Sequence, residues 1–121
     1  MYFVKVLVID DNQNTTCLIS KYLNAKGIDN TVTNDPTDGL KKIKEGNYDK
    51  VLLDISMPEF SGIDIIHTLE REHRLQDQKI IIFSAISFTD SEIQYLLQKE
   101  GVQVCLKKPI NLNTLLTTVT C

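Results

Sequence analysis

Short apolar runs in this sequence end in polar side chains that could bind a metal ion and a phosphoryl group. These side chains belong to Asp10, Asp11, Asp54, Ser84 and Lys108. Three adjacent carboxylates repel one another, and a divalent cation would remove that repulsion. Oxygen ligands without a nearby histidine or cysteine favour Mg²⁺ or Mn²⁺ over Zn²⁺. The lysine and such a cation could neutralise a phosphoryl group while a carboxylate oxygen attacks phosphorus in line.

The apolar runs themselves predict the strands that position these side chains. They are short, mostly β-branched and non-alternating, which is typical of parallel strands buried on both faces. Strands are expected at residues 6–9, 28–33, 51–53, 80–83 and 102–106. Helical patterns follow each strand, at 14–26, 35–46, 61–69, 90–101 and 111–119. The predicted fold class is therefore α/β, with five βα units forming one doubly wound domain over residues 1–121.

Helix starts are marked by side chains that can cap them. Asp35 precedes Pro36, a typical first helical residue, and Ser61 with Asp64 forms a capping-box pattern. Asp90 and Asn111 are placed as further N-caps.

The carboxyl ends of parallel strands meet at one edge of the sheet, where doubly wound folds bind their ligands. Taken alone, an aspartate after a strand is often only a cap or turn residue, and an isolated lysine is often a solvated charge. Their joint placement at successive strand ends is what favours a functional site.

Composition narrows the function classes. The chain has 121 residues, 42% of them apolar and 24% charged, as expected for one globular domain. Its formal charge of -3, with no run rich in Lys and Arg, gives no general attraction to nucleic acid or an anionic membrane. The apolar runs are too short to cross a bilayer. Three cysteines without CxxC spacing suggest reduced thiols and a cytoplasmic protein, with Cys17 expected in the core.

The motifs resemble the receiver domain of two-component response regulators over essentially the whole chain. The resemblance is carried by Val8-Ile9-Asp10-Asp11, by Leu53-Asp54-Ile55-Ser56-Met57-Pro58 with Gly62, by Phe83-Ser84-Ala85 and by Lys107-Lys108-Pro109. It implies the flavodoxin-like strand order 2-1-3-4-5 and a cis Lys108–Pro109 peptide bond.

The resemblance also implies roles for the site residues. Asp54 would accept a phosphoryl group from a phosphohistidine on a sensor histidine kinase or phosphotransfer protein. Asp10, Asp11, Asp54 and the backbone carbonyl of Ser56 would hold Mg²⁺ or Mn²⁺. Ser84 would be the switch hydroxyl and Lys108 the lysine that pairs with the phosphoryl group. Such a domain assists only its own phosphorylation and dephosphorylation, so a signalling domain rather than an enzyme is expected.

Phosphorylation in this family switches the surface of the fourth helix, fifth strand and fifth helix. That surface would act on a protein target in trans or an output domain in cis, and could support a homodimer; no direct contact with nucleic acid or membrane is expected. The family usually has an aromatic residue three positions before the lysine, where this chain has Cys105. This departure predicts a weaker response of the surface. Ile86, two residues after Ser84, predicts slow to moderate autodephosphorylation.

Two other interpretations remain open at this stage. A receiver-like adaptor could bind partners without phosphorylation, and Cys105 is the one residue that favours it. A Mg²⁺-dependent α/β phosphatase is disfavoured, because adjacent Asp10 and Asp11 lack the D-x-D spacing of the haloacid dehalogenase type. Nucleotide binding has no motif support, since GxxxxGK[ST] and GxGxxG are both absent.

Overall fold

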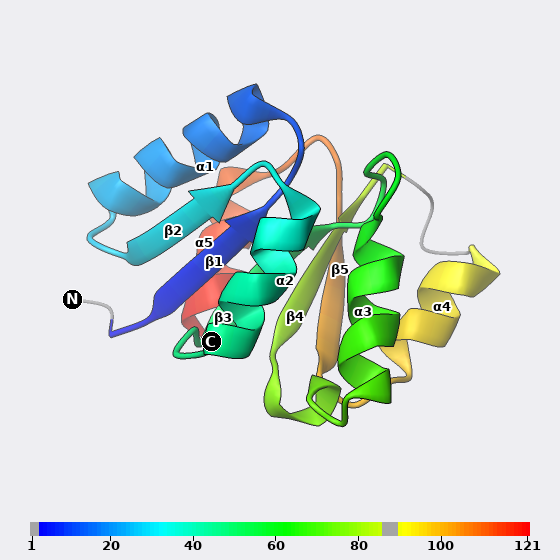
Figure 1. The fold of residues 1–121 in the computed structure, drawn as a ribbon. Coiled ribbons are helices and arrows are strands. Elements are labelled where there is room, and N and C mark those ends of the chain that lie inside the picture. Colours follow the sequence, from blue (N-terminus) through cyan, green and yellow to red (C-terminus); the bar gives the residue numbers. More distant parts are fainter. Residues whose placement is uncertain (1–2, 86–89) are drawn as a thin grey trace.

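A computed structural model describes residues 3–85 and 90–121, which form a parallel five-stranded sheet with helices on both faces (Figure 1). The strands are β1 (Lys5–Ile9), β2 (Asp29–Thr33), β3 (Lys50–Asp54), β4 (Ile80–Ser84) and β5 (Val102–Lys107). The helices are α1 (Gln13–Ala25), α2 (Pro36–Glu45), α3 (Gly62–Arg71), α4 (Ser91–Leu97), α5 (Leu112–Thr120) and the 3₁₀ turn η1 (Leu75–Asp77). The strand order is β2-β1-β3-β4-β5, which confirms the predicted α/β class and topology.

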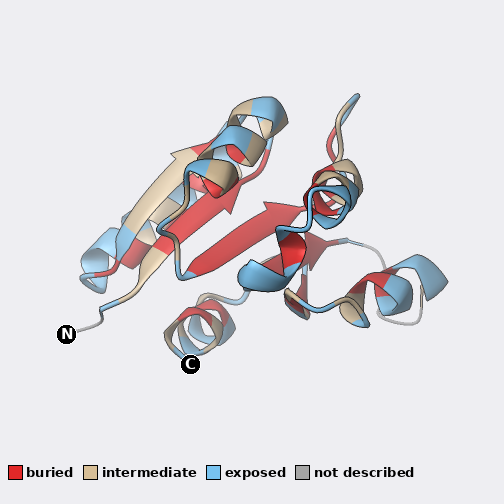
Figure 2. Cartoon of the chain, turned by 60° about the horizontal axis from the view of Figure 1, so that its bottom comes forward, coloured by how far each residue is buried: buried red, intermediate tan, exposed pale blue. Residues whose placement is uncertain are grey.

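The sheet separates two apolar layers. Helices α2, α3 and α4 cover one face, while α1 and α5 cover the other (Figure 1). The first layer includes Ile43, Ile66 and Ile93, and the second includes Ile19 and Leu115. The central strands β1 and β3 are buried almost throughout, whereas β2 at one edge is mostly half-buried (Figure 2). This explains why the runs at β1 and β3 are apolar without alternation and β2 is polar.

The predicted caps are present. The side chains of Asp35, Asp90 and Asn111 accept hydrogen bonds from backbone N–H groups in the first turns of α2, α4 and α5. Ser61 and Asp64 form the capping box of α3 in both directions. The Lys108–Pro109 bond is cis, as predicted.

The end of α4 differs from the prediction. The sequence places it at Gly101, but the helix ends at Leu97. Gly101 instead has a φ of 99° and passes against η1, where a Cβ would collide with the backbone carbonyl of Leu75. Its glycine therefore serves a close backbone approach rather than a helix end.

Two further predictions concern single residues. Cys17 is exposed, so its expected place in the core is wrong. The helical face that packs on the sheet carries Thr16, Ile19 and Leu23, and position 17 points away from it. Ile86 lies outside the described residues. No helix in the described part of the chain is long and apolar enough to cross a membrane.

Candidate functional site

Asp10 is fixed where β1 gives way to α1. Its side chain is fully buried, and its Oδ1 accepts a hydrogen bond of 2.9 Å from the backbone N–H of Asn12. The backbone of Asp10 is held as well, because its N–H donates to the carbonyl of Thr33 at 3.2 Å. Asp11 follows and is exposed. One carboxylate of the pair is thus preorganised inside the site and the other lies at its rim.

Asp54 closes β3 next to β1. It is 2% exposed, and its Oδ1 accepts a hydrogen bond of 3.1 Å from the backbone N–H of Ser56. Gly62, the first residue of α3, lies directly against this turn, and a Cβ there would collide with the carbonyl oxygen of Asp54. The glycine in the sequence motif therefore lets α3 approach the strand end that carries the carboxylate.

Lys108 joins the two buried carboxylates. Its Nζ lies 3.0 Å from Asp10 Oδ2 and 3.4 Å from Asp54 Oδ1. The backbone N–H of Lys108 donates to the carbonyl of Ser84 at 2.8 Å, which ties the end of β5 to the end of β4. The lysine is thereby placed by the sheet and by its own side-chain contacts.

The carboxylates form a cluster that fits a divalent cation. One oxygen each from Asp10, Asp11 and Asp54 lies within 4.8 Å of the others. With Lys108, the group carries three negative charges and one positive charge. The donors are all oxygens, which suits Mg²⁺ or Mn²⁺.

The surroundings of Asp54 and Lys108 shift the pKa values of both groups. Burial raises the pKa of Asp54 from 3.8 to about 6, and the charge of Asp10 adds to this effect, whereas the N–H of Ser56 and the Lys108 ammonium oppose it. Burial alone would lower the pKa of Lys108, but the hydrogen bond it donates to Asp10 and the charge of Asp54 outweigh burial and raise it. At neutral pH, Asp54 is therefore an ionised carboxylate beside a protonated lysine.

The other predicted residues take different places. Ser84 is fully buried at the end of β4, so it belongs to the same edge of the sheet. Ser56 is exposed, and its observed contribution is the backbone N–H that orients Asp54. The role of its carbonyl remains a prediction. Cys105 is 3% exposed in the layer shared with α4, and burial raises the pKa of its thiol.

Sequence reasoning missed one residue that organises the site. The Asn34 side-chain amide donates to the carbonyl of Asp10 and to the hydroxyl of Thr16, each at 2.9 Å. It links the end of β2 to the start of α1 around Asp10. The available signal was its position directly after a predicted strand, the same signal that identified the aspartates.

A groove opens beside Lys108 between the start of α1 and the loop that leads to α5. Its volume is about 210 Å³, and it is lined by Thr15, Leu18, Ile19, Lys108, Pro109 and Ile110. Leu18 is 52% exposed, which is unusual among the large apolar residues of the described chain. The cluster of Asp10, Asp54 and Lys108 thus adjoins an apolar surface.

A known protein family and several known proteins are similar to this chain. The family model of the response regulator receiver domain matches residues 6–120. The luminescence regulatory protein LuxO of Vibrio campbellii is 27% identical over 112 residues, which cover 93% of this chain and 24% of that protein. The chain therefore spans about a quarter of the length of this relative.

Solved structures agree in fold. The receiver domain of Francisella response regulator 1452 superimposes with a TM-score of 0.83 at 33% identity, covering 96% of this chain and 93% of that one. The response regulator protein TrrA of Thermotoga maritima, solved in complex with Mg(2+)-BeF, gives a TM-score of 0.79 at 28% identity and covers 97% of this chain and 96% of its own.

Proposed function

Since the chain belongs to the response regulator receiver domain family of two-component systems, we propose that Asp54 accepts a phosphoryl group and thereby switches the domain between two signalling states. The observation that carries the proposal is the Lys108 ammonium, which lies between the buried carboxylates of Asp10 and Asp54. A cation in this position neutralises charge that would otherwise oppose an incoming phosphoryl group.

The transfer is a displacement at phosphorus. A carboxylate oxygen of Asp54 forms the new O–P bond, and the N–P bond of a phosphohistidine breaks as its imidazole leaves and recovers a proton. The N–H of Ser56 holds Asp54 in one orientation before reaction. In this proposal Lys108 neutralises phosphoryl oxygens, and the Ser84 hydroxyl binds one of them after a local movement.

The cation is proposed to be Mg²⁺ or Mn²⁺, held by Asp10, Asp11, Asp54 and the carbonyl of Ser56. When bound, it supplies further charge neutralisation for the phosphoryl oxygens. Asp10 and Asp54 form the buried part of this site, and exposed Asp11 lies at its rim. The relative TrrA, with its Mg(2+)-BeF complex, supports this assignment.

The phosphodonor is proposed to be a sensor histidine kinase or phosphotransfer protein of the cytoplasm. It would dock over the groove beside Lys108, with Leu18 as an apolar contact. This surface adjoins the site, so a donor bound there could deliver its phosphohistidine to Asp54. The output is proposed to pass through α4, β5 and α5 to a protein target, either in trans or as a domain in cis. The domain itself turns over no external substrate.

A direct experiment tests the central step. The protein is incubated with Mg²⁺ and acetyl phosphate, and the adduct is located by intact mass and peptide mapping. We expect one phosphoryl group on Asp54, no adduct in Asp54→Asn and none when EDTA replaces Mg²⁺. An unmodified wild-type protein under these conditions would favour the adaptor interpretation. Turnover of phosphoester substrates would favour a phosphatase.

Leu18→Asp tests the docking surface separately from the chemistry. Phosphorylation by acetyl phosphate should be unchanged, because Leu18 is neither one of the clustered carboxylates nor the lysine that pairs with them. Transfer from a cognate phosphohistidine protein should slow roughly tenfold, since an interface anchor becomes charged. Phe3→Asp is the matched control, because Phe3 is 88% exposed and lies outside the groove. Equal transfer rates for Leu18→Asp and the wild type would contradict the docking proposal.

A further inference from the structure

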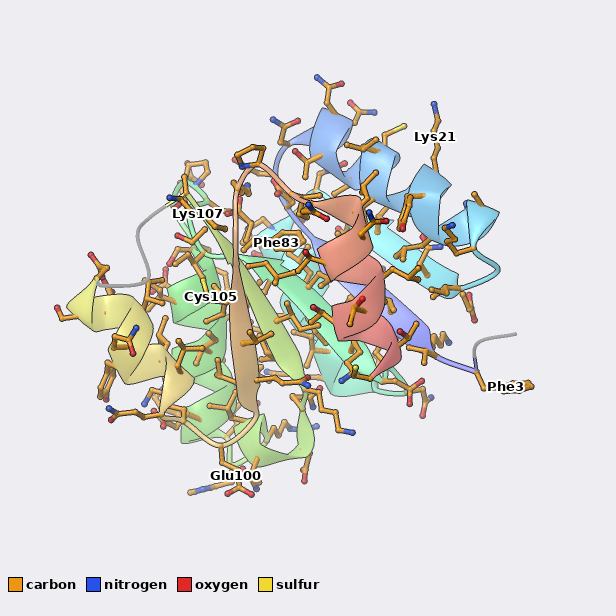
Figure 3. All side chains as sticks on the ribbon, turned by 180° about the vertical axis from the view of Figure 1, so that it is seen from behind. Phe3, Lys21, Phe83, Glu100, Cys105 and Lys107 are labelled. Carbon is orange, nitrogen blue, oxygen red and sulfur yellow. The ribbon has the colours of Figure 1, made fainter. Side chains whose placement is uncertain are left out.

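A second lysine lies at the end of the sheet opposite the phosphoryl site. The two ends of β5 are seen in Figure 3, where Lys107 lies at the site end and Glu100 just before the other. Lys50 begins β3 at that second end and is only 3% exposed. Lysine is rarely buried to this extent without a partner of opposite charge.

Lys50 has no such partner among the described residues. Its Nζ donates one hydrogen bond of 3.0 Å, to the side-chain carbonyl oxygen Oε1 of Gln103 on β5. No carboxylate of the described chain lies within ion-pair distance of it, in contrast to Lys108. The neighbouring Asp49 is already used, because its Oδ2 accepts from the backbone N–H of Lys5 at 2.8 Å.

This arrangement leaves binding capacity unused. An ammonium can donate three hydrogen bonds, and the described residues provide one acceptor. A buried charge that lacks a counter-charge is destabilising. Burial, together with the charge of Lys79, lowers the pKa of Lys50, although Cys121 and Asp49 oppose this at longer range. The neighbourhood is therefore positive and short of acceptors.

An open recess is lined in part by Gln103, the hydrogen-bond partner of this lysine. Its volume is about 320 Å³, and it is lined by Gln78, Lys79, Gly101, Val102 and Gln103. Gln103 connects the two features, because its Oε1 faces Lys50 and its amide nitrogen has no hydrogen-bond acceptor among the described residues. The amide nitrogen is thus available as a donor to a ligand in the recess.

The wall of the recess is held in place by the backbone. Gly101 has a φ of 99° and packs against the carbonyl of Leu75. Its own carbonyl accepts from the N–H of Ile80 at 2.8 Å, which joins it to β4. The recess therefore has a fixed shape on this side, as a preorganised binding site requires.

We propose that this recess binds a phosphate-like oxyanion, with Lys79 and the Gln103 amide as direct contacts and Lys50 as the buried charge behind them. Two ammonium groups match a dianion better than a monocarboxylate. The geometry of Lys50, Gln103 and the recess carries the proposal, which is independent of the phosphorylation of Asp54.

The test is a titration of the isotopically labelled full chain with inorganic phosphate at constant ionic strength, followed by the NMR amide signals of Gly101, Val102 and Gln103. We expect saturable shifts of these signals, and weaker shifts with acetate. Lys50→Met should weaken phosphate binding roughly tenfold or more, as for the loss of a charge-assisted interaction. Lys21→Met, which removes an exposed lysine of α1, is the control and should bind as the wild type does.

Gln103→Glu is a second variant that keeps the side-chain shape. Its carboxylate supplies the missing counter-charge to Lys50, so phosphate should no longer bind and the unfolding temperature should rise. Gln13→Glu adds the same charge at the start of α1 and should leave phosphate binding unchanged.

Three results would overturn the proposal. They are shifts that do not saturate, shifts confined to signals around Lys108, and unchanged affinity in both Lys50→Met and Gln103→Glu. The signals resolve the two ends of the sheet, so binding at the phosphoryl site is not mistaken for binding in the recess.

Discussion

The two ends of the sheet each hold a lysine, half-buried Lys108 at one end and buried Lys50 at the other, and the two differ in what surrounds them. At the carboxyl ends of the strands, Lys108 lies between Asp10 and Asp54. At the amino ends, the one hydrogen bond that the Lys50 ammonium donates within the described residues goes to the uncharged Gln103. The pKa of Lys108 is raised by its carboxylates, in spite of burial, whereas that of Lys50 is lowered by burial and by Lys79.

The difference shows that the partner, rather than burial alone, decides what a lysine can do. Lys108 already pairs with two carboxylates, in the cluster that we propose binds a metal ion and a phosphoryl group. Lys50 has charge and donors that the described residues leave unused. The same residue type thus marks a proposed phosphoryl-transfer site at one end and a proposed oxyanion site at the other.

The largest expected effect is on the rate of phosphorylation, which we propose depends on the lysine at the carboxyl ends of the strands. Lys108→Met should slow phosphorylation by acetyl phosphate roughly 100-fold, because it removes a preorganised charge aimed at the phosphoryl oxygens. Rates are measured from the growth of the Asp54 adduct, with Lys21→Met as the control for charge loss. A rate within twofold of the wild type would show that Lys108 does not assist the transfer.

The two methionine substitutions should also shift the free energy of unfolding in opposite directions. Lys108→Met leaves two buried carboxylates without their cation and should destabilise the metal-free protein by roughly 2–4 kcal/mol. Lys50→Met removes an unpaired buried charge and should stabilise it by roughly 1–3 kcal/mol. Urea unfolding in EDTA measures both. Destabilisation by Lys50→Met would mean that Lys50 has a structural partner that its contacts do not reveal.

A smaller effect follows from the raised pKa of Asp54. Between pH 3.8 and about pH 6, the folded state keeps a proton on Asp54 that the unfolded chain has lost. This contribution to stability is present below the lower value and is lost as the pH rises through the higher one. Asp54→Asn removes it, so the variant should gain roughly 1 kcal/mol on the wild type between about pH 5 and about pH 7.5, measured in EDTA.

The smallest effect concerns the proposed oxyanion site. Glu100 is exposed and precedes Gly101, so its negative charge lies next to the recess. Glu100→Gln should strengthen phosphate binding about twofold, as expected for the removal of a solvent-screened repulsion. The NMR titration with inorganic phosphate measures this change in affinity. Unchanged or weaker binding by Glu100→Gln would place the ligand away from this end of β5.

Much of the fold could be predicted because local rules and global structure agree. Apolar β-branched runs became the buried strands, and Asp35, Ser61, Asp90 and Asn111 became helix caps. Asp10, Asp54 and Lys108 could be grouped because parallel strands share one carboxyl edge. The prediction for Cys17 failed where helical periodicity, measured from Ile19 and Leu23, would have placed it outside.

Other features depend on contacts that local sequence does not contain. The end of α4 at Leu97 and the use of Gly101 depend on the packing of η1 against the start of β5. Lys50 resembles any charged residue beside a strand in the sequence, and its hydrogen bond to Gln103 of β5 appears only once the sheet has formed. The hydrogen bonds of Asn34 to Asp10 and Thr16 likewise require the start of α1 to lie beside β2.

Cys105 gives the molecule a reporter of its own motions. Two of the three thiols, those of Cys17 and Cys121, are exposed, and the third is enclosed between β5 and the α4 side of the sheet. Burial raises the pKa of the Cys105 thiol, which keeps it in its unreactive form. A thiol reagent should therefore label two cysteines at once and the third only when the region around α4 and β5 opens. The rate of that slow labelling, compared with and without phosphodonor, would measure how far a signal at Asp54 loosens the surface proposed to carry it.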